Sequence, residues 1–311
     1  MAHDLDIHPA SPDELVAAHR NVFDIWSKGL PLEEHLRYRL HSPSHCRANW
    51  FVGTIDGQVV VSLGCYPLGF RLRGETVSGI AIGSVYSLRE FRGRGFAPRL
   101  LAGVEEHARR TRTALGVLYS DIGADYYAAL GYQACPSFEG WCAPSDLPRP
   151  ATASRLMRFA PAENLPAIAK LYADYHGAMP LSVARDGDYW QSILEKNATD
   201  EFYALCEPQG IWQGYVRIGR KGDDWRITDL ALANQSDELG EQLYAALGEL
   251  ARSNGAARVG GWLSDTGATR KLFTLTPRAT EITMIKPLAD VGPLDQSLIA
   301  GTSRFCEIDH V

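Results

Sequence analysis

The chain has 311 residues, of which 45% are hydrophobic and 22% are charged, so it is long enough for two domains that each bury a core. Its formal net charge of −6 and isoelectric point near 5.9 argue against a protein that holds nucleic acid by its overall charge. The same charge would tolerate a cationic small molecule.

The cysteine pattern and the apolar runs exclude two further classes. The six cysteines form no Cys-x-x-Cys pair, and no His and Cys cluster has the spacing of a zinc site. We therefore expect no metal, and we interpret the cysteines as small buried side chains in a reducing compartment. No N-terminal leader and no run of roughly 20 apolar residues is present, which predicts a cytoplasmic protein without membrane contact.

The first half alternates strand and helix patterns. In chain order we expect a strand over 5–9, a helix over 11–29 capped by Ser11, a helix over 31–40, strands over 49–70 and 74–88, a helix from Phe96 to 110, a buried strand over 114–120 and a short helix over 123–131. Asp56-Gly57 and Gly74 are turn signals typical of antiparallel strands. This order predicts an α/β fold, an α+β mixed sheet with helices on both faces.

A proline-rich stretch, "APSDLPRPATAS", breaks all periodicity and is typical of a linker. We therefore predict a first domain over 1–143, a linker over 144–154 and a second domain over 155–311. Three pairs of segments repeat in the same order: 7–18 with 157–168, 100–109 with 243–252, and 120–124 with 264–268. Shared helix composition explains the second pair but not the repeated Ser-Asp-x-Gly-Ala. The repeats favour two copies of one fold.

The segment "RGRGFA", from Arg92 to Ala97, lies between a predicted strand and a predicted helix. Glycines let a backbone approach closely, and the first amides of a helix are left without partners. The helix dipole and two arginines add positive charge, so the segment could cradle a pyrophosphate. Glycines before a helix also form ordinary tight turns, and the motif by itself does not decide.

Two motifs together are more specific. Arg92, Gly95 and Ala97 fill the pattern [Q/R]-x-x-G-x-[G/A], and downstream "YYAALGY" brings Tyr127, Leu130, Gly131 and Tyr132 into register with a second motif. In both, residues 5–140 resemble the GNAT superfamily of acyl-CoA-dependent N-acyltransferases. The resemblance implies a sheet whose fourth and fifth strands splay apart to admit pantetheine.

The resemblance also implies a set of residues that bind acetyl-CoA. The backbone of Val85, Tyr86 and Ser87 would pair with pantetheine amides and polarise the thioester carbonyl. The amides of Arg92, Gly93, Arg94, Gly95, Phe96 and Ala97 would hold the pyrophosphate, with Arg94 adding charge. Ser120 stands where many members have an asparagine that contacts pantetheine, so this contact is weaker or lost.

Catalysis would need an acid and a base. Tyr127 takes the position of the tyrosine that protonates the departing thiolate, a role that its neighbour Tyr126 could fill instead, and either ring is also compatible with core packing. Asp121, directly after the fifth strand, is the nearest candidate base. Glu33, Glu34, His45 and Glu139 lie on segments that could line an acceptor cleft, and a chain of waters is a further alternative. Each of these side chains also suits a solvated surface or a helix cap.

Narrower resemblances concern the acceptor and the second copy. The string "VLYSDIGADYYAALGY" resembles fungal lysine N6-acetyltransferases, and the tandem arrangement is similar to Eis-type aminoglycoside acetyltransferases. The latter add a sterol-carrier-like domain whose terminal carboxylate enters the active site; 311 residues leave no room for that domain, which argues against such a role for Val311. In the second copy "NQSDELG" replaces the phosphate loop, and Asp237 and Glu238 would repel a pyrophosphate.

These observations predict two tandem GNAT-like domains; the second lacks the CoA loop and either supports the first domain or walls its acceptor cleft. The expected activity is transfer of an acetyl group from acetyl-CoA to the primary amine of a small molecule, lysine or another amine, within a ternary complex. A non-catalytic acyl-CoA-binding regulatory module is one alternative. Acetylation of a protein lysine or N-terminus is another.

Overall fold

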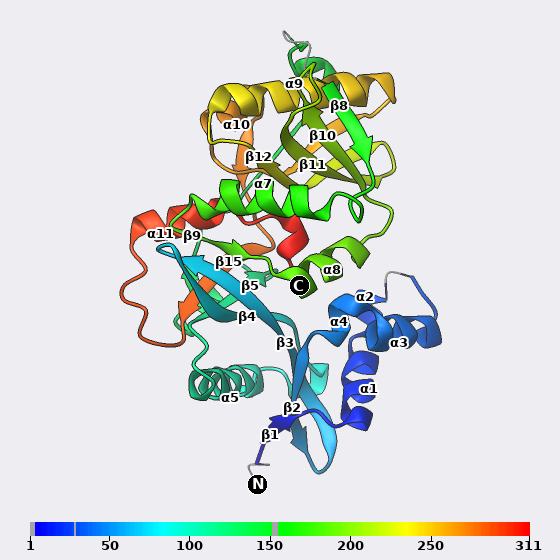
Figure 1. Cartoon of the computed structure of the whole chain (residues 1–311). Coiled ribbons are helices and arrows are strands. Elements are labelled where there is room, and N and C mark those ends of the chain that lie inside the picture. Colours follow the sequence, from blue (N-terminus) through cyan, green and yellow to red (C-terminus); the bar gives the residue numbers. More distant parts are fainter. Residues whose placement is uncertain (1–3, 28, 151–154) are drawn as a thin grey trace.

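The computed structural model describes residues 4–27, 29–150 and 155–311, which form two mixed β-sheets with helices packed on them (Figure 1). The strand order of the first sheet is β1-β2-β3-β4-β5-β15-β6, with β9 beside β3. The strand order of the second sheet is β14-β7-β13-β12-β11-β10-β8. The mixed α/β class that the sequence predicts is therefore confirmed.

The first sheet contains β1 (Asp6–Pro9), β2 (Asn49–Ile55), β3 (Gln58–Leu72), β4 (Glu75–Ser87), β5 (Leu115–Ser120), β6 (Gln133–Ala134), β9 (Leu181–Ala184) and β15 (Ile282–Pro287). The second contains β7 (Phe138–Cys142), β8 (Arg155–Phe159), β10 (Glu201–Cys206), β11 (Trp212–Lys221), β12 (Asp224–Leu232), β13 (Arg258–Trp262) and β14 (Leu275–Pro277). The helices are α1 (Pro12–Asn21), α2 (Phe23–Trp26), α3 (Leu32–His41), α4 (Pro43–Cys46), α5 (Phe96–Arg110), α6 (Asp125–Ala128), α7 (Leu165–Gly177), α8 (Gly187–Glu195), α9 (Asp237–Ser253), α10 (Gly267–Leu272) and α11 (Gln296–Gly301).

The predicted helix over 11–29 is two helices in the structure. Ser11 caps α1 in a capping box, in which Glu14 accepts a hydrogen bond from the Ser11 amide at 2.9 Å. The first helix ends at Asn21, because Val22 leaves the helical conformation and its side chain is buried. Residue 28 lies outside the described residues.

The two halves repeat one structural unit. In the first half β4 leads through α5 to β5, which pairs with β4 in parallel. In the second half β12 leads through α9 to β13, which again pairs in parallel. The repeated sequence segments therefore correspond to a repeated strand, helix and parallel strand, as predicted.

The two sheets also exchange strands across the predicted division. β9 and β15, from the second half, join the first sheet, where β15 runs antiparallel to β5. β7, from the first half, lies between β13 and β14 in the second sheet. The predicted linker over 144–154 begins with a short 3₁₀ turn at Pro144–Asp146, and residues 151–154 lie outside the described residues. The domain limits stay a prediction, but no single cut in the chain separates the sheets.

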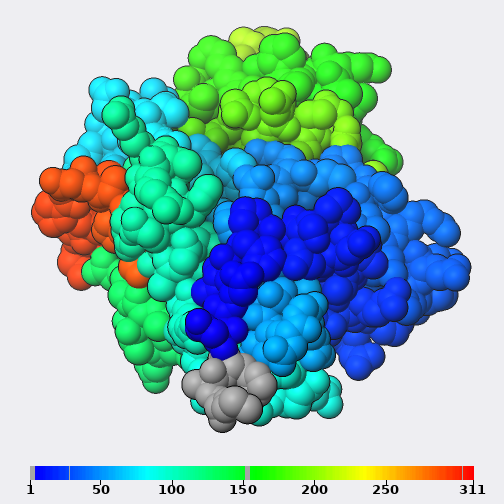
Figure 2. All heavy atoms as spheres, turned by 90° about the horizontal axis from the view of Figure 1, so that it is seen from below, coloured from blue at the N-terminus to red at the C-terminus, as the bar shows by residue number. Residues whose placement is uncertain are grey.

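One apolar cluster joins the two sheets. It includes Phe70 and Leu115 of the first sheet together with Trp190, Ile227 and Phe305 from the second half. From below, segments of the first half cover the centre of the surface and green segments of the second half border it (Figure 2). This shared core fixes the two halves against each other.

Two expectations about single features have different outcomes. Among the described helices, none is long and apolar enough to span a membrane. The expectation that all six cysteines are buried is wrong for Cys46, which is exposed. This residue ends the four-residue helix α4 at the surface, and its thiol donates to the Leu40 carbonyl at 3.2 Å.

Candidate active site

The turn between β4 and α5 is held open by glycine. Gly93 and Gly95 have φ values of 76° and 74°, in the left-handed region that costs glycine least. A Cβ added to either residue would meet nothing within 4 Å, so open space lies beside the loop. Gly95 caps α5 without any side-chain hydrogen bond to the helix.

The backbone amides in this turn lack hydrogen-bond acceptors. Among the hydrogen bonds of the described residues, none gives an acceptor to the N–H groups of Gly93, Arg94, Gly95, Phe96 or Ala97. Five unpaired amides at the positive end of a 15-residue helix form a site for an anion. The residues present therefore suit the diphosphate of an acyl-CoA.

A groove of about 520 Å³, the α5 groove, runs from this turn along the edge of β4. β4 pairs with β5 only from Gly79 to Ile82. β4 continues to Ser87 and β5 to Ser120 without further pairing between them, while β15 pairs with the other edge of β5 along its whole length, so β4 and β5 separate. The splayed strands that the resemblance implied are present in the structure.

Most of the predicted cofactor residues line the α5 groove. They are Val85, Tyr86, Ser87, Arg92, Gly93, Gly95, Phe96 and Ala97. Arg94 does not line it, because its guanidinium donates to the Glu90 carbonyl at 3.1 Å and lies over the ring of Phe91. Ser120 does not line it either, since its buried hydroxyl donates to the Gly123 carbonyl at 2.5 Å. Their side chains stabilise the local turns instead.

Tyr127, on α6, lies at the wall of the groove. Its side chain is only 8% exposed, whereas that of Tyr126 is 38% exposed and also lines the groove. Burial raises the pKa of Tyr127 to about 12, and the nearby Tyr126 and Asp121 add to the shift. The phenol therefore keeps its proton at neutral pH, as a proton donor must.

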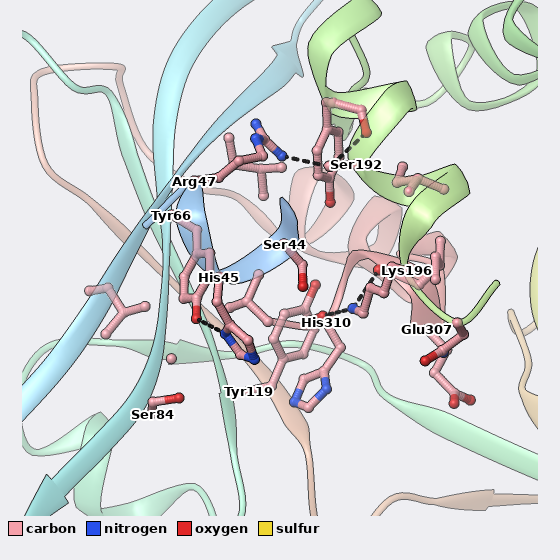
Figure 3. Close-up of a pocket in the computed structure, with 18 of the residues that line it drawn as sticks. Ser44, His45, Arg47, Tyr66, Ser84, Tyr119, Ser192, Lys196, Glu307 and His310 are labelled. Carbon is pink, nitrogen blue, oxygen red and sulfur yellow. Dashed lines mark hydrogen bonds between the residues drawn. The ribbon is translucent and has the colours of Figure 1, made fainter. Parts of the chain in front are cut away.

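A second cavity of about 370 Å³, the central cavity, lies between the two halves of the chain. His45 and Tyr66 approach it from one side, and Lys196 and Glu307 from the other (Figure 3). Trp26 lines both this cavity and the α5 groove.

A bulge in β4 marks the boundary between the two spaces. The register of β3 and β4 shifts there, and Ser84 has a φ of 52°. Gly83 and Ser84 line the central cavity, whereas the next residue, Val85, lines the α5 groove. A group held along β4 can therefore reach from one space into the other.

The last residues of the chain form part of the cavity wall. The buried side chain of Arg185 forms ion pairs with Asp229 at 2.7 Å and with Asp309 at 2.9 Å. The Tyr189 hydroxyl also donates to Asp309 at 2.9 Å. Burial alone would raise the pKa of Asp229, but the charge and hydrogen bonds of Arg185 bring it below its ordinary value.

These contacts hold His310 and Val311 in the central cavity. Lys196 adds hydrogen bonds to the carbonyls of Ile308, at 3.0 Å, and His310. A Cβ added to Gly83 would lie 3.1 Å from the main-chain oxygen of Val311. Val311, which we did not expect at the site, therefore lies against the β4 bulge.

The candidate bases divide into two groups. Asp121 and His45 line the central cavity, and Nδ1 of His45 lies 3.2 Å from the Tyr66 hydroxyl. Glu33 and Glu34 are exposed on α3, Glu139 lies on β7 of the second sheet, and none of the three lines either space. The structure thus brings Tyr127, Asp121 and His45 to the same region.

Sequence reasoning missed most of the central cavity. Tyr66 and Tyr119 lie on strands that read only as core, and Lys196 and His310 lie in segments without any motif. Their only signal is a polar or aromatic side chain next to an apolar run. That signal is too common to identify a site.

Comparison with known proteins gives a family match for the first half of the chain. Residues 7–135 match the family model of the acetyltransferase (GNAT) domain. Among proteins of curated function, none is significantly similar to the sequence.

Solved structures share the fold of the whole chain at low sequence identity. A probable N-acyltransferase from Enterococcus faecalis V583 is 15% identical with a TM-score of 0.74, over 92% of this chain and 72% of that one. Eis1 from Mycobacterium abscessus is 18% identical with a TM-score of 0.63, over 92% and 74%. A tandem GNAT protein from the clavulanic acid biosynthesis pathway is 14% identical with a TM-score of 0.56, over 94% and 100%. Residues 7–135 therefore match a GNAT acetyltransferase domain, and the chain as a whole shares the two-sheet fold of a tandem GNAT protein.

Proposed function

We propose that the protein transfers the acetyl group of acetyl-CoA to the primary amine of a small molecule, by direct attack within a ternary complex. One observation carries this proposal: the unmatched amides at the start of α5 open into a groove that passes Tyr127 and meets a second cavity at the β4 bulge. Acetyl-CoA supplies the activated acyl group as a thioester.

On the donor side, each role falls to a residue that lines the α5 groove. The amides from Gly93 to Ala97 bind the diphosphate, and the free edge of β4 from Val85 to Ser87 pairs with the pantetheine amides. Tyr127 donates its proton to the departing thiolate. Its raised pKa supports this role, because the phenol stays protonated until it is needed.

On the acceptor side, the amine must lose a proton before it attacks. An amine with a pKa near 10.4 pays about 4.6 kcal/mol for this at pH 7, so a proton acceptor at the site matters. We assign this role to Asp121, which lines the central cavity close enough to Tyr127 to affect its pKa. His45, hydrogen-bonded to Tyr66 in the same cavity, is the alternative.

The volume and the walls of the central cavity favour a small acceptor. Its volume of about 370 Å³ falls in the range of small-molecule pockets. Side chains of both halves wall it, including Tyr189 and Glu307 of the second half. A regulatory module that only senses acyl-CoA would need no such second cavity.

The test is the release of CoA thiol from acetyl-CoA in the presence of a panel of small primary amines. We expect release with at least one amine, and a tenfold or greater loss of kcat for either Asp121→Asn or His45→Gln, whichever removes the base. Binding of CoA without release of CoA thiol from acetyl-CoA in the presence of any amine would contradict transfer. A thermal shift that is complete with CoA alone would then indicate the regulatory alternative.

A further inference from the structure

We propose that Arg39 binds a carboxylate of the acceptor, so that the acceptor is a small amine that also carries an acid group. This inference rests on the proposed function, because it concerns the molecule that occupies the central cavity. Arg39 lies on α3 and lines that cavity, and its side chain is only 8% exposed.

The guanidinium of Arg39 has no partner of opposite charge. Among the described residues, no carboxylate oxygen lies within 4.0 Å of it, and no hydrogen bond is formed by its side chain; the guanidinium lies over the ring of Trp26, 5.6 Å from the ring centroid. The residues outside the described part, 1–3, 28 and 151–154, include no Asp or Glu. No acidic side chain of this chain is therefore left to neutralise Arg39.

The histidines beside Arg39 do not neutralise its charge. Burial lowers the pKa of His19 to about 4 and lowers that of His35, and the charge of Arg39 adds to both shifts. Both imidazoles are therefore neutral at pH 7, and neither supplies a negative charge. A buried cation without a partner is destabilising, and a bound anion would offset this effect.

The other cations that line the cavity differ from Arg39. Arg47 donates to the Ser192 hydroxyl at 3.1 Å and to the Pro67 carbonyl at 3.2 Å. Lys196 donates to main-chain carbonyls of the C-terminal residues. These two side chains are used to hold the wall together, whereas the donors of Arg39 are available to a ligand.

The remaining charges of the cavity favour a carboxylate over a phosphate. Asp121 and Glu281 line the same space and would repel a dianion, but they suit the ammonium group of an amine; Glu307, which also lines it, is paired with Arg226 at 2.6 Å. One planar guanidinium matches the two oxygens of a single carboxylate. The cavity is therefore complementary to a zwitterion.

The test compares matched ligands on the full chain. The probes are a set of amino acids, L-lysine among them, each with its carboxamide, and O-phosphoethanolamine for the phosphate group. The proteins are the wild type, Arg39→Gln, Arg39→Lys and, as a control, Arg37→Gln, which removes an exposed arginine of the same helix. We measure kcat/KM with acetyl-CoA, and the shift in Tm that each probe causes in the presence of CoA.

In the wild type and in Arg37→Gln, we expect at least one acid to exceed its carboxamide by about 10- to 100-fold in kcat/KM. Arg39→Gln should remove this preference and Arg39→Lys should keep part of it. Arg39→Gln should not lower the Tm of the free protein, because an unpaired charge is removed.

Five outcomes decide the proposal. Equal use of acids and carboxamides, or a preference that survives in Arg39→Gln, overturns it while leaving the acyltransferase in place. A preference for O-phosphoethanolamine overturns the choice of a carboxylate. If no amine is acetylated, a rise in Tm with acids that is lost in Arg39→Gln still supports the carboxylate site. The absence of both turnover and any such rise overturns it.

Discussion

The starts of α5 and α9 occupy equivalent places in the two repeated units and differ in how their amides are used. α5 begins after Gly95, which offers no side-chain cap. α9 begins after Ser236, whose hydroxyl accepts a hydrogen bond from the Leu239 amide at 3.2 Å.

The α9 start is closed further by Asp237. Its carboxylate accepts a hydrogen bond from the Ala268 amide at 2.9 Å, and it fills the space beside Gly267. Glu238 adds a second negative charge in the first turn. The same structural unit thus offers a site for an anion only where the chain leaves the helix start bare, and the following predictions test that difference.

The largest expected effect follows from giving α5 the acidic start of α9. Gly95→Asp puts a carboxylate beside the unmatched amides and a side chain at a φ of 74°, so we expect affinity for acetyl-CoA to fall by about 100-fold or more. Equilibrium binding measures this. Gly222→Asp is the matched control, because Gly222 also has a positive φ and open space around it, in the turn between β11 and β12. Equal affinity in both variants would contradict the assigned diphosphate site.

Tyr127→Phe should reduce kcat by roughly 10²- to 10⁴-fold, because the variant lacks the proton for the leaving thiolate. Tyr126→Phe, on the same short helix, should change kcat little. Since the pKa of Tyr127 is raised to about 12, the phenol stays protonated as the pH rises and loses its proton only as the pH approaches 12. We therefore expect no fall in wild-type kcat between pH 7 and 10 from this group; a fall in that range that disappears in Tyr127→Phe would refute the assignment.

Asp309→Ala tests whether the second half serves the acceptor rather than the donor. Removing one partner of the buried Arg185 should lower the free energy of unfolding by about 3 kcal/mol and loosen the residues around Val311. We expect a higher KM for the amine and unchanged affinity for acetyl-CoA. Urea unfolding and substrate kinetics measure the two effects, and an equal loss of both affinities would contradict the division of roles.

The smallest effect is expected at the α9 start. Ser236→Ala removes the cap and should lower stability by about 1 kcal/mol, measured by urea unfolding. Affinity for acetyl-CoA should stay at the wild-type value. A clear loss of affinity would show that the α9 start also takes part in binding.

Local features of the site could be predicted from the sequence. The conformations of Gly93 and Gly95 and the helix that follows them depend on residues close together in the chain. The capping box at Ser11 and Glu14 is of the same kind. Such features are determined within one turn of the backbone, so a motif is sufficient to locate them.

Features that depend on distant segments were missed. β15 pairs with β5 across more than half of the chain, and Asp309 meets Arg185 across 124 residues. Some local features were missed as well, because no motif specifies that the side chains of Arg94 and Ser120 bond to nearby carbonyls. In the sequence, Arg39 is one of several charged residues on an amphipathic helix. Only the folded cavity shows that it lacks a partner of opposite charge.

The central claim is that the bare start of α5 holds an acyl-CoA and the capped start of α9 does not. Isothermal titration of acetyl-CoA into the purified full chain tests it most directly. We predict one bound equivalent per chain for the wild type and no detectable binding for Gly95→Asp at the same concentrations. Two equivalents per chain, or one equivalent that survives in Gly95→Asp, would contradict the claim.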